Sequence, residues 1–230
     1  MELKKGAVAI ITARGGSKRI PRKNIKLFCG QPIIAYPIRA AIESGCFDTV
    51  MVSTEDEEIA AIAREYGAEI PFMRSMATAG DMVTTDDVLR EVLMEYRQRG
   101  EEYEQFCCIY PTSPLLDAKR LQTAMKMLAK RECDGVIPIV AFPSPPQRGI
   151  VIKAGMACRQ YPVYQDARSQ DLETIYRDSG QFYACRTDAF FAAGTLMVEK
   201  LHPLILSEME TQDIDTDEDW WLAELKWRNR

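Results

Sequence analysis

Short apolar segments alternate with amphipathic segments of helical spacing along the first 140 residues, and this alternation limits the possible folds more than any other feature. Ala7–Ala13 is almost wholly apolar and too short for a buried helix, which predicts a strand covered on both faces. Similar strands are expected at Thr49–Ser53, Phe106–Tyr110 and Gly135–Val140. Strands that alternate with helices predict a doubly wound α/β sheet with mostly parallel strands.

The segments between these strands carry signals for the ends of helices. Helices are expected over residues 56–66, 86–99 and 117–131, and glycine follows each of the first two. Asp117 is placed to cap the third of them with its carboxylate. Pro32 favours the start of a further helix that ends near Ser44, and Pro37 inside it would remove a backbone hydrogen bond and kink it.

The alternation breaks at residues 138–162, which hold five of the twelve prolines. Gly149–Lys153 and Met156–Arg159 are placed to pair as a hairpin around Ala154-Gly155. We expect an α/β core formed by residues 1–140 and 179–230, with an excursion at 141–178 that acts as a lid or as an arm on a second subunit. Later elements are expected as strands at 181–185 and 204–206 and a helix at 217–227.

The composition removes several classes of protein. The 230 residues are 47% hydrophobic and 27% charged, which excludes collagen, coiled coils and general disorder. No apolar run approaches the ~18 residues of a membrane span, and a basic run follows Ala13 where a signal peptide would be cleaved. The net charge of -5 argues against general nucleic-acid binding. We therefore expect no membrane and no nucleic-acid partner.

Cysteine and histidine content removes several kinds of site. The seven cysteines include no C-x-x-C pair, so they indicate neither a zinc ribbon nor a redox motif. They are typical of buried thiols in a reducing, cytoplasmic protein. His202 is the only histidine, and its place before a strand-like segment favours a structural role over a metal site or a Ser-His-Asp triad.

The charges are separated along the chain. Residues 14–26 hold six basic side chains and no acid, whereas residues 208–219 hold seven acids and no base. Such a separation suggests an anionic ligand with a metal ion between the two segments.

The basic segment begins directly after the first predicted strand, where doubly wound sheets bind their ligands. Gly15 and Gly16 allow the backbone to approach a ligand closely, and their amides can form an anion-binding nest. Arg14, Lys18 and Lys23 can then surround a polyphosphate. The segment matches neither the P-loop nor the dinucleotide fingerprint. A solvated basic loop is the alternative, and the position after the strand favours a ligand site.

The acidic segment contains a closely spaced pair of carboxylates. Asp213 and Asp215 share one face if the chain is extended, and they can hold one Mg²⁺ with waters and phosphate oxygens. The alternative is a helix cap by Asp215 or Thr216, with the acids that follow favouring the positive end of the helix. Both can hold at once, because the two aspartates precede the helix.

A third cluster lies at residues 168–173 and 176–183, where polar, aromatic and arginine side chains surround a glycine. The cluster suits a polyhydroxylated ligand with a carboxylate, which Arg168 would pair. The alternative is an exposed loop followed by a strand of the sheet.

Four segments, in this order, make the chain similar to a known family. Residues 13–24, 52–56, 110–114 and 213–216 resemble the motifs of the cytidylyltransferases that activate nine-carbon acidic sugars, and the resemblance covers nearly the whole chain. Within that family, residues 107–112, 168–173 and 180–183 are most similar to the branch that acts on pseudaminic acid.

The resemblance implies a GT-A-like nucleotide-sugar transferase fold and a homodimer whose arms reach across to the partner. It implies that CTP and the sugar acid give a CMP-sugar and pyrophosphate, with Mg²⁺, or alternatively Mn²⁺, on Asp213 and Asp215. Arg14, Lys18, Lys23 and Asp215 would be catalytic. The residues implied for the nucleotide are Arg14, Gly15, Gly16, Ser17, Lys18, Lys23, Asn24, Arg74 and Thr85, and those for the sugar are Tyr110, Arg168, Gln181 and Tyr183.

Other functions remain as alternatives. The same reaction on N-acetylneuraminate, legionaminate or KDO differs only in the acceptor. A non-catalytic nucleotide-binding module would be expected to lose the acidic pair or the lysines of the basic loop, and both are present. A sugar-1-phosphate nucleotidyltransferase would more often carry a longer glycine-rich loop and a C-terminal extension, and a dehydrogenase would carry its fingerprint.

Overall fold

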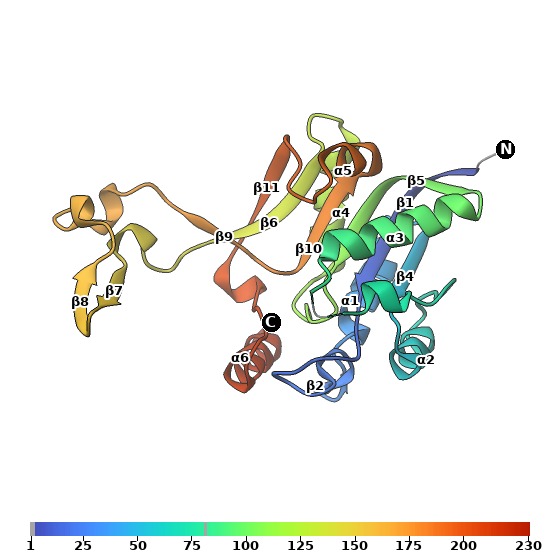
Figure 1. Ribbon diagram of the computed structural model, residues 1–230, viewed down its shortest axis with the longest axis horizontal. Helices are drawn as coiled ribbons and strands as arrows, with labels where there is room; N and C mark the ends of the chain where they lie inside the picture. Colours follow the sequence, from blue (N-terminus) through green and yellow to red (C-terminus); the bar gives the residue numbers. More distant parts are fainter. Residues whose placement is uncertain (1–2, 81) are drawn as a thin grey trace.

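The apolar strands pair in a single large sheet. The computed structural model describes residues 3–80 and 82–230, and in these residues a seven-stranded sheet has the order β11-β6-β10-β5-β1-β4, with β9 paired to β6 (Figure 1). Its strands are β1 (Leu3–Thr12), β4 (Thr49–Ser53), β5 (Glu101–Ile109), β6 (Gly135–Ala141), β9 (Tyr176–Asp178), β10 (Phe182–Arg186) and β11 (Leu201–Leu206). β1 is parallel to β4 and β5, and β6 is parallel to β11, whereas β10 is antiparallel to both of its neighbours. The predicted α/β class with a mostly parallel sheet is confirmed.

Helices cover both faces of this sheet, which explains the apolar runs in its central strands. Ala9 and Ile11 of β1 belong to one buried cluster with residues of α1, α2 and α4, whereas Val8 and Ile10 belong to a second cluster with residues of α3 and α5. The helices are α1 (Ala35–Ser44), α2 (Glu57–Glu65), α3 (Thr85–Gln98), α4 (Ala118–Ala129), α5 (Thr187–Ala193) and α6 (Asp217–Arg228). Short 3-10 helices occur at Lys23–Ile25, Met76–Thr78, Pro146–Arg148, Pro162–Tyr164, Ser169–Asp171 and Glu208–Glu210.

The predicted start of the first helix is wrong. Pro32 lies in β3 (Gln31–Pro32), which pairs with β2 (Leu27–Phe28), and α1 begins only at Ala35. Pro37 therefore lies in the first turn of the helix, where a backbone N–H has no intrahelical partner, and its ring costs no hydrogen bond. The kink expected at Pro37 therefore has no missing hydrogen bond to cause it. α5 was not predicted at all, although its neighbours were.

A third buried cluster joins the two ends of the chain. Ile20 of the basic segment and Ile214 of the acidic segment both pack in it, against Trp220 of α6. The ring of Phe28 lies 5.7 Å from that of Trp220 and 5.3 Å from that of Tyr36, in edge-to-face contacts. This cluster holds α6 beside β2, as Figure 1 shows.

Residues between β6 and β9 project from the sheet as an arm (Figure 1). Within it, β7 (Ile150–Lys153) and β8 (Met156–Arg159) pair with each other in a separate two-stranded sheet, as the sequence predicts. Ala154 and Gly155 form the turn with φ of 49° and 78°, the left-handed conformation that a two-residue hairpin requires. The arm thus has little of the packing that surrounds the main sheet.

The cysteines behave as small apolar residues. All seven are free thiols, and four of them, Cys107, Cys108, Cys133 and Cys185, are buried. Burial raises the pKa of the Cys185 thiol to about 12, so this group stays protonated and inert near neutral pH. In the described part of the chain, no helix has the length and apolar character needed to span a membrane.

Candidate active site

A cavity opens where the carboxyl ends of the parallel strands β1 and β5 meet. Its volume is about 310 Å³, and Thr12 at the end of β1 and Tyr110 just after β5 line it. This is the edge at which open α/β sheets bind ligands. Eight of the residues predicted for the nucleotide or the sugar line this one cavity: Arg14, Ser17, Lys18, Lys23, Asn24, Arg74, Thr85 and Tyr110.

The glycine-rich part of the basic segment is held from behind. The amide of Gly15 donates to Glu55 Oε1 at 2.8 Å, and Asn24 Nδ2 donates to the carbonyl of Arg14 at 2.8 Å. A Cβ added at Gly15 would collide with the carboxylate of Asp56, whereas one at Gly16 would meet nothing within 4 Å. The amide of Gly15 is thus bonded to Glu55, and Gly16 has open space beside it. Neither glycine is among the residues that line the cavity.

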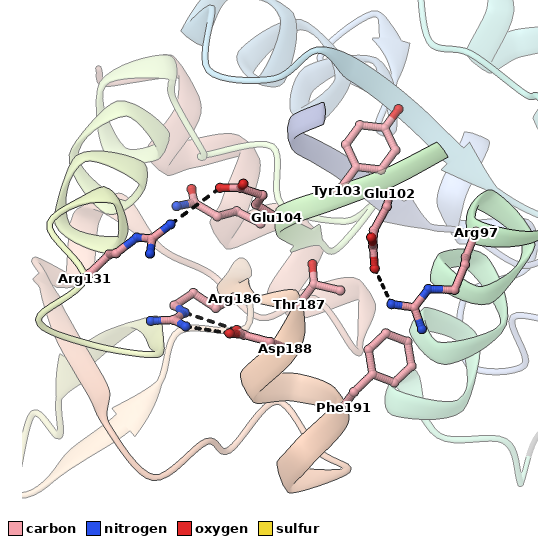
Figure 2. Close-up of a pocket in the computed structure, with 10 residues that line it drawn as sticks. Arg97, Glu102, Tyr103, Glu104, Arg131, Arg186, Thr187, Asp188 and Phe191 are labelled. Carbon is pink, nitrogen blue, oxygen red and sulfur yellow. Dashed lines mark hydrogen bonds and ion pairs between the residues drawn. The ribbon is translucent and has the colours of Figure 1, made fainter. Parts of the chain in front are cut away.

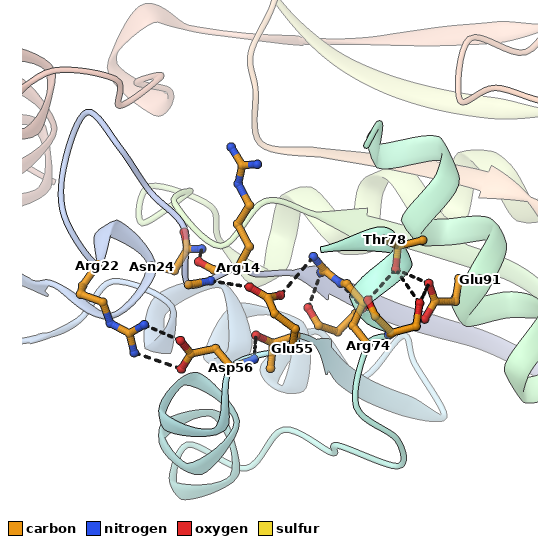
Figure 3. Close-up of polar contacts among 12 residues, drawn as sticks. Arg14, Arg22, Asn24, Glu55, Asp56, Arg74, Thr78 and Glu91 are labelled. Carbon is orange, nitrogen blue, oxygen red and sulfur yellow. Dashed lines mark hydrogen bonds and ion pairs between the residues drawn. The ribbon is translucent and has the colours of Figure 1, made fainter. Parts of the chain in front are cut away.

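The far side of the same segment is fixed by an ion pair. Arg22, whose φ is 54°, directs both terminal nitrogens of its guanidinium at Asp56, with an Nη2–Oδ1 distance of 3.0 Å (Figure 3). Asp56 also caps α2 by accepting from the amides of Glu58 and Ile59. The hydrogen bond from Arg22 and these amides lower the pKa of Asp56 to about 2. Sequence reasoning recognised residues 52–56 as a motif but did not assign Glu55 or Asp56 a role.

Arg74 forms the opposite wall of the cavity. Its side chain is buried, and it donates from Nε to Ser53 Oγ at 3.0 Å and from Nη2 to the Ser53 carbonyl at 2.5 Å. Burial lowers the pKa of Arg74, and the negative charges of Glu55 and Glu91 oppose that shift. The segment that follows is tied to α3, because the Ser75 amide donates to Glu91 at 2.8 Å and Thr78 bonds the same carboxylate (Figure 3).

The acidic segment meets the basic segment at the rim of the cavity. Lys23 Nζ donates to the Ile214 carbonyl at 2.6 Å and lies 3.4 Å from Asp215 Oδ1. Arg19 Nη1 lies 2.7 Å from Asp215 Oδ2. Ile214 is fully buried while Asp213 and Asp215 on either side are accessible, so the two carboxylates are held beside the buried cluster. Two residues of the basic segment thus contact Asp215 of the acidic segment, whereas neither Asp213 nor Asp215 is among the residues that line the cavity.

The donor set of the acidic pair fits a hard divalent cation. Partial desolvation and the charge of Asp215 raise the pKa of Asp213, which means that the pair carries a repulsion that a bound cation would relieve. Among the residues that the structure describes, no three His, Cys, Asp or Glu side chains gather to hold a metal ion. Two carboxylates with oxygens from a phosphate ligand and water are the usual protein surroundings of Mg²⁺.

The helix cap that was the alternative for this segment is also present. Thr216 is the N-cap of α6 and forms a capping box with Asp219, whose Oδ2 accepts from the Thr216 amide at 2.8 Å. Lys226 on the same helix donates to the carbonyls of Glu208 and Thr211 at 2.7 and 2.8 Å, so it fixes the segment that leads to Asp213. The pattern of the sequence gave no signal for this role of Lys226.

Two of the four residues predicted to bind the sugar lie close to each other. The rings of Tyr110 and Tyr183 are 6.1 Å apart, and Tyr110 Oη lies 3.4 Å from Thr85 Oγ1. Tyr183 donates its hydroxyl to Asp178, a residue that sequence reasoning left without a role. Burial raises the pKa of Tyr110 to about 12, so its hydroxyl remains a donor at neutral pH.

The other two are placed differently. Gln181 lies just before β10 and is buried. Its carbonyl accepts from the Tyr110 amide at 2.9 Å, and its side-chain amide donates to the Glu210 carbonyl at 2.6 Å, so it connects Tyr110 with the acidic segment. Arg168 is exposed in the arm, just before the 3-10 helix Ser169–Asp171, and is not among the residues that line the cavity. Within one chain, the structure therefore separates Arg168 from Tyr110 and Tyr183.

A second cavity, of about 330 Å³, lies at the opposite edge of the sheet, beside the start of β5 and the end of β10 (Figure 2). Its arginines face carboxylates: Arg186 Nη2 is 2.6 Å from Asp188 Oδ2, and Arg131 Nη2 is 3.7 Å from Glu104 Oε2. Because its opposite charges are paired with one another, it lacks the cationic surplus of the first cavity.

The fold and the site define a class of protein. A mostly parallel α/β sheet, with a cationic cavity at the carboxyl ends of its strands and an acidic pair at the rim, is the arrangement of a nucleotidyltransferase. The chain belongs to the cytidylyltransferase family, whose sequence pattern matches residues 8–216. The enzyme class predicted from the motifs is confirmed.

Individual proteins of this family and one solved structure are similar to the chain over nearly its whole length. The chain is 33% identical to the pseudaminic acid cytidylyltransferase of Campylobacter jejuni over 222 residues, which are 96% of each chain. It is 31% identical to the CMP-N,N'-diacetyllegionaminic acid synthase of Legionella pneumophila, over 94% of each chain. In structure it is similar to a CMP:2-keto-3-deoxy-manno-octonic acid synthetase complexed with CTP, with a TM-score of 0.70, 17% identity and coverage of 98% of this chain and 99% of that one.

Proposed function

We propose that this cytidylyltransferase transfers CMP from CTP to the anomeric hydroxyl of pseudaminic acid and releases pyrophosphate. The observation that carries the proposal is the contact of Lys23 with Asp215 beside the cationic cavity, because a cationic wall next to an acidic pair suits a triphosphate with its metal ion. The named relatives support the choice of nucleotide and of a nine-carbon acid as acceptor.

In the proposed reaction, the sugar oxygen forms a bond to the α-phosphorus of CTP while the bond from that phosphorus to the bridging oxygen breaks. Pyrophosphate leaves with the bonding electron pair, and one of the two aspartates accepts the hydroxyl proton. Such transfer depends on positioning and on neutralisation of charge. Arg14, Lys18 and Lys23 line the cavity and would stabilise the charge that grows on pyrophosphate.

The acidic pair fits Mg²⁺, and Mn²⁺ has the same preference for oxygen ligands. Asp213 and Asp215 would hold the ion. When bound, it would neutralise charge on the α-phosphate and lower the pKa of the attacking hydroxyl. Lys23 would keep Asp215 in place through the Ile214 carbonyl, to which it donates at 2.6 Å.

The acceptor would bind beside Tyr110 and Tyr183, whose hydroxyls and rings suit a polar sugar with apolar faces. Asp178 orients Tyr183 by accepting a hydrogen bond from its hydroxyl, and the Gly180 amide donates to the same carboxylate at 2.9 Å. Gly180 also brings the sugar-binding residues close to the two aspartates proposed for the metal ion, since a Cβ added at Gly180 would lie 3.7 Å from Asp213 Cγ.

We propose further that the fold is GT-A-like, with residues 1–140 and 179–230 as the nucleotide-binding core and an excursion at 141–178. The residues of this excursion between β6 and β9 would form a homodimer and a lid over the partner's sugar site, whereas β9 itself pairs with β6 in the main sheet. An isolated two-stranded hairpin is only marginally stable in water. The arm exposes Ile150, Ile152, Met156 and Val163, side chains that a second chain would cover. Arg168 would then reach the sugar carboxylate of the partner. The free cysteines support a reducing compartment such as the cytoplasm.

The test is pyrophosphate release by the purified protein with Mg²⁺, with CTP compared against ATP, GTP and UTP. Pseudaminic acid, N-acetylneuraminate, legionaminate and KDO are compared as acceptors. We expect release with CTP and pseudaminic acid at the highest kcat/KM. Faster turnover of another acid would assign the same chemistry to that acceptor, and binding of CTP without release for any acid would indicate a non-catalytic module.

A further inference from the structure

Glu55 lies behind the cavity and interacts with both the glycine-rich loop and Arg74. It follows β4, and its side chain is 14% exposed. Oε1 accepts the amide of Gly15 at 2.8 Å, and Oε2 lies 3.7 Å from Arg74 Nη1 (Figure 3). Arg74 lines the cavity, whereas Glu55 does not. One carboxylate thus connects the glycine-rich loop with the arginine that faces it.

The two oxygens of this carboxylate are in different situations. Oε1 is satisfied by the Gly15 amide, but Oε2 is buried and has no hydrogen-bond partner in the described residues. A buried carboxylate oxygen without a hydrogen bond is unfavourable unless a nearby positive charge compensates it. Arg74 supplies that charge, and the burial of Arg74 requires a counter-charge in turn. Each of the two groups therefore fixes the other.

Removal of Glu55 would disturb the cavity more than the fold. The far side of the loop keeps the pair of Arg22 with Asp56, and Ile20 keeps its place in the buried cluster. Arg74 keeps its two hydrogen bonds to Ser53. What would be lost is the connection between Gly15 and Arg74, hence the distance between the two walls.

We propose that Glu55 is a positioning residue, which sets the separation of the Gly15 loop and Arg74 to the width of the CTP phosphates without touching the nucleotide. The inference rests on the proposed function, because it takes CTP as the ligand. A displacement of about 1 Å in a binding site can cost up to about 100-fold in rate, so a loosened wall should be measurable.

The experiment compares Glu55→Ala and Glu55→Gln with wild type, by the KM for CTP, the KM for the acceptor sugar, kcat and the melting temperature. Glu55→Ala removes both contacts, and we expect the KM for CTP to rise about tenfold or more, as for the loss of hydrogen bonds to a charged group. Glu55→Gln keeps an acceptor for Gly15 but loses the charge beside Arg74, so its KM for CTP should lie between those of wild type and Glu55→Ala. The KM for the sugar should stay within about twofold, since the tyrosines of the sugar side do not contact Glu55.

Glu58→Gln is the matched control. Glu58 is a neighbouring carboxylate that binds Arg22 on the exposed side of the loop, with a side chain that is 66% exposed. We expect wild-type KM values for it. An unchanged KM for CTP in Glu55→Ala, or an equal rise in both KM values, would overturn the inference. If Glu55→Ala does not fold, Glu55→Gln is the deciding variant. A KM for CTP equal to that of wild type would then overturn the positioning role of the Glu55 charge beside Arg74.

The two levels of the proposal fail in different ways. Absence of CTP binding and of pyrophosphate release in the wild-type protein would refute the proposed function. Normal turnover by wild type together with normal turnover by Glu55→Ala would refute only the positioning role.

Discussion

The rim of the cavity and the arm both lie outside the regular part of the sheet, yet they are held in opposite ways. Ile20 and Ile214, at the centres of the basic and acidic segments, are 2% and 0% exposed. Ile152 and Val163 in the arm are 79% and 82% exposed. The same kind of side chain anchors one region from within the chain and is left to solvent in the other.

The difference in burial shows that the rim of the cavity and the arm obtain their stability from different sources. The charged segments of the rim are fixed by Lys23, by Asp56 and by a shared aromatic cluster, all supplied by the same chain. The arm makes its own hairpin and exposes apolar surface, a combination that requires cover from outside. The residues proposed for the nucleotide and the metal ion therefore lie together in one chain, whereas Arg168 would reach the sugar from a second chain under the proposed dimer.

The largest effect is expected where the two charged segments meet. Lys23→Ala and Asp215→Asn should each lower kcat by about 100-fold to 1000-fold, since each removes a group that acts on the developing charge. Pyrophosphate release is the measurement, and circular dichroism checks the fold. Lys26→Ala is the control, because Lys26 pairs with Asp217 at 3.3 Å on the outer side of the segment. Wild-type turnover by either active-site variant would contradict the assignment.

A charge in the arm tests the proposed homodimer. If the arm forms the dimer contact, Ile152→Glu would place a carboxylate in it, and we expect the Kd of the dimer to rise about 100-fold. Light scattering over a range of concentrations measures the mass. Met197→Glu, at an exposed position outside the arm, is the control and should leave the mass unchanged. A monomeric wild type with full activity would show that the arm has another role.

Truncation of Ile214 and of Ile152 compares the stability of the cavity rim with that of the arm. Ile214→Ala should cost about 2–4 kcal/mol in the free energy of unfolding, because it leaves a cavity in the buried cluster. Ile152→Ala, measured at a concentration where the protein is monomeric, should change it by less than about 0.5 kcal/mol. Urea titration gives both values. Equal losses would mean that the arm is packed within its own chain.

The smallest effect concerns the ion pair of the loop. The pKa of Asp56 falls from 3.8 to about 2 on folding, so its charged form stabilises the protein above the unfolded value, and this stabilisation disappears as the pH falls through about 2. Asp56→Asn keeps the helix cap. The substitution should lower the free energy of unfolding by about 1–2 kcal/mol at pH 6, after allowance for the exposure of Arg22, and by almost nothing at pH 2. Urea titration at the two pH values is the measurement. A difference that stays constant with pH would contradict the role of this charge.

Local patterns predicted the ligand-binding edge well, because the cause of each feature lies within a few residues. The apolar run of β1 and the glycines after it require only local arguments, and so does the cap of α6 by Thr216. The start of α1 was wrong because Pro32 suits a helix start and a hairpin strand equally, and only the pairing of β2 with β3 decides between them. No local pattern predicts that the side chain of Gln181 bonds the Glu210 carbonyl, because the two residues are 29 positions apart; its role at the sugar stays a prediction.

Apolar periodicity and charge are properties of each residue, so the class of fold, the cationic segment after β1 and the carboxylate pair could be predicted from the sequence. The contact of Lys23 with Asp215, the connection of Gly15 with Arg74 through Glu55 and the position of Arg168 in the arm depend on how the whole chain folds. These relations join residues that lie far apart in the chain. The burial of Ile20 and Ile214 in one cluster brings the first and the last of the segments together, and no local pattern specifies that contact.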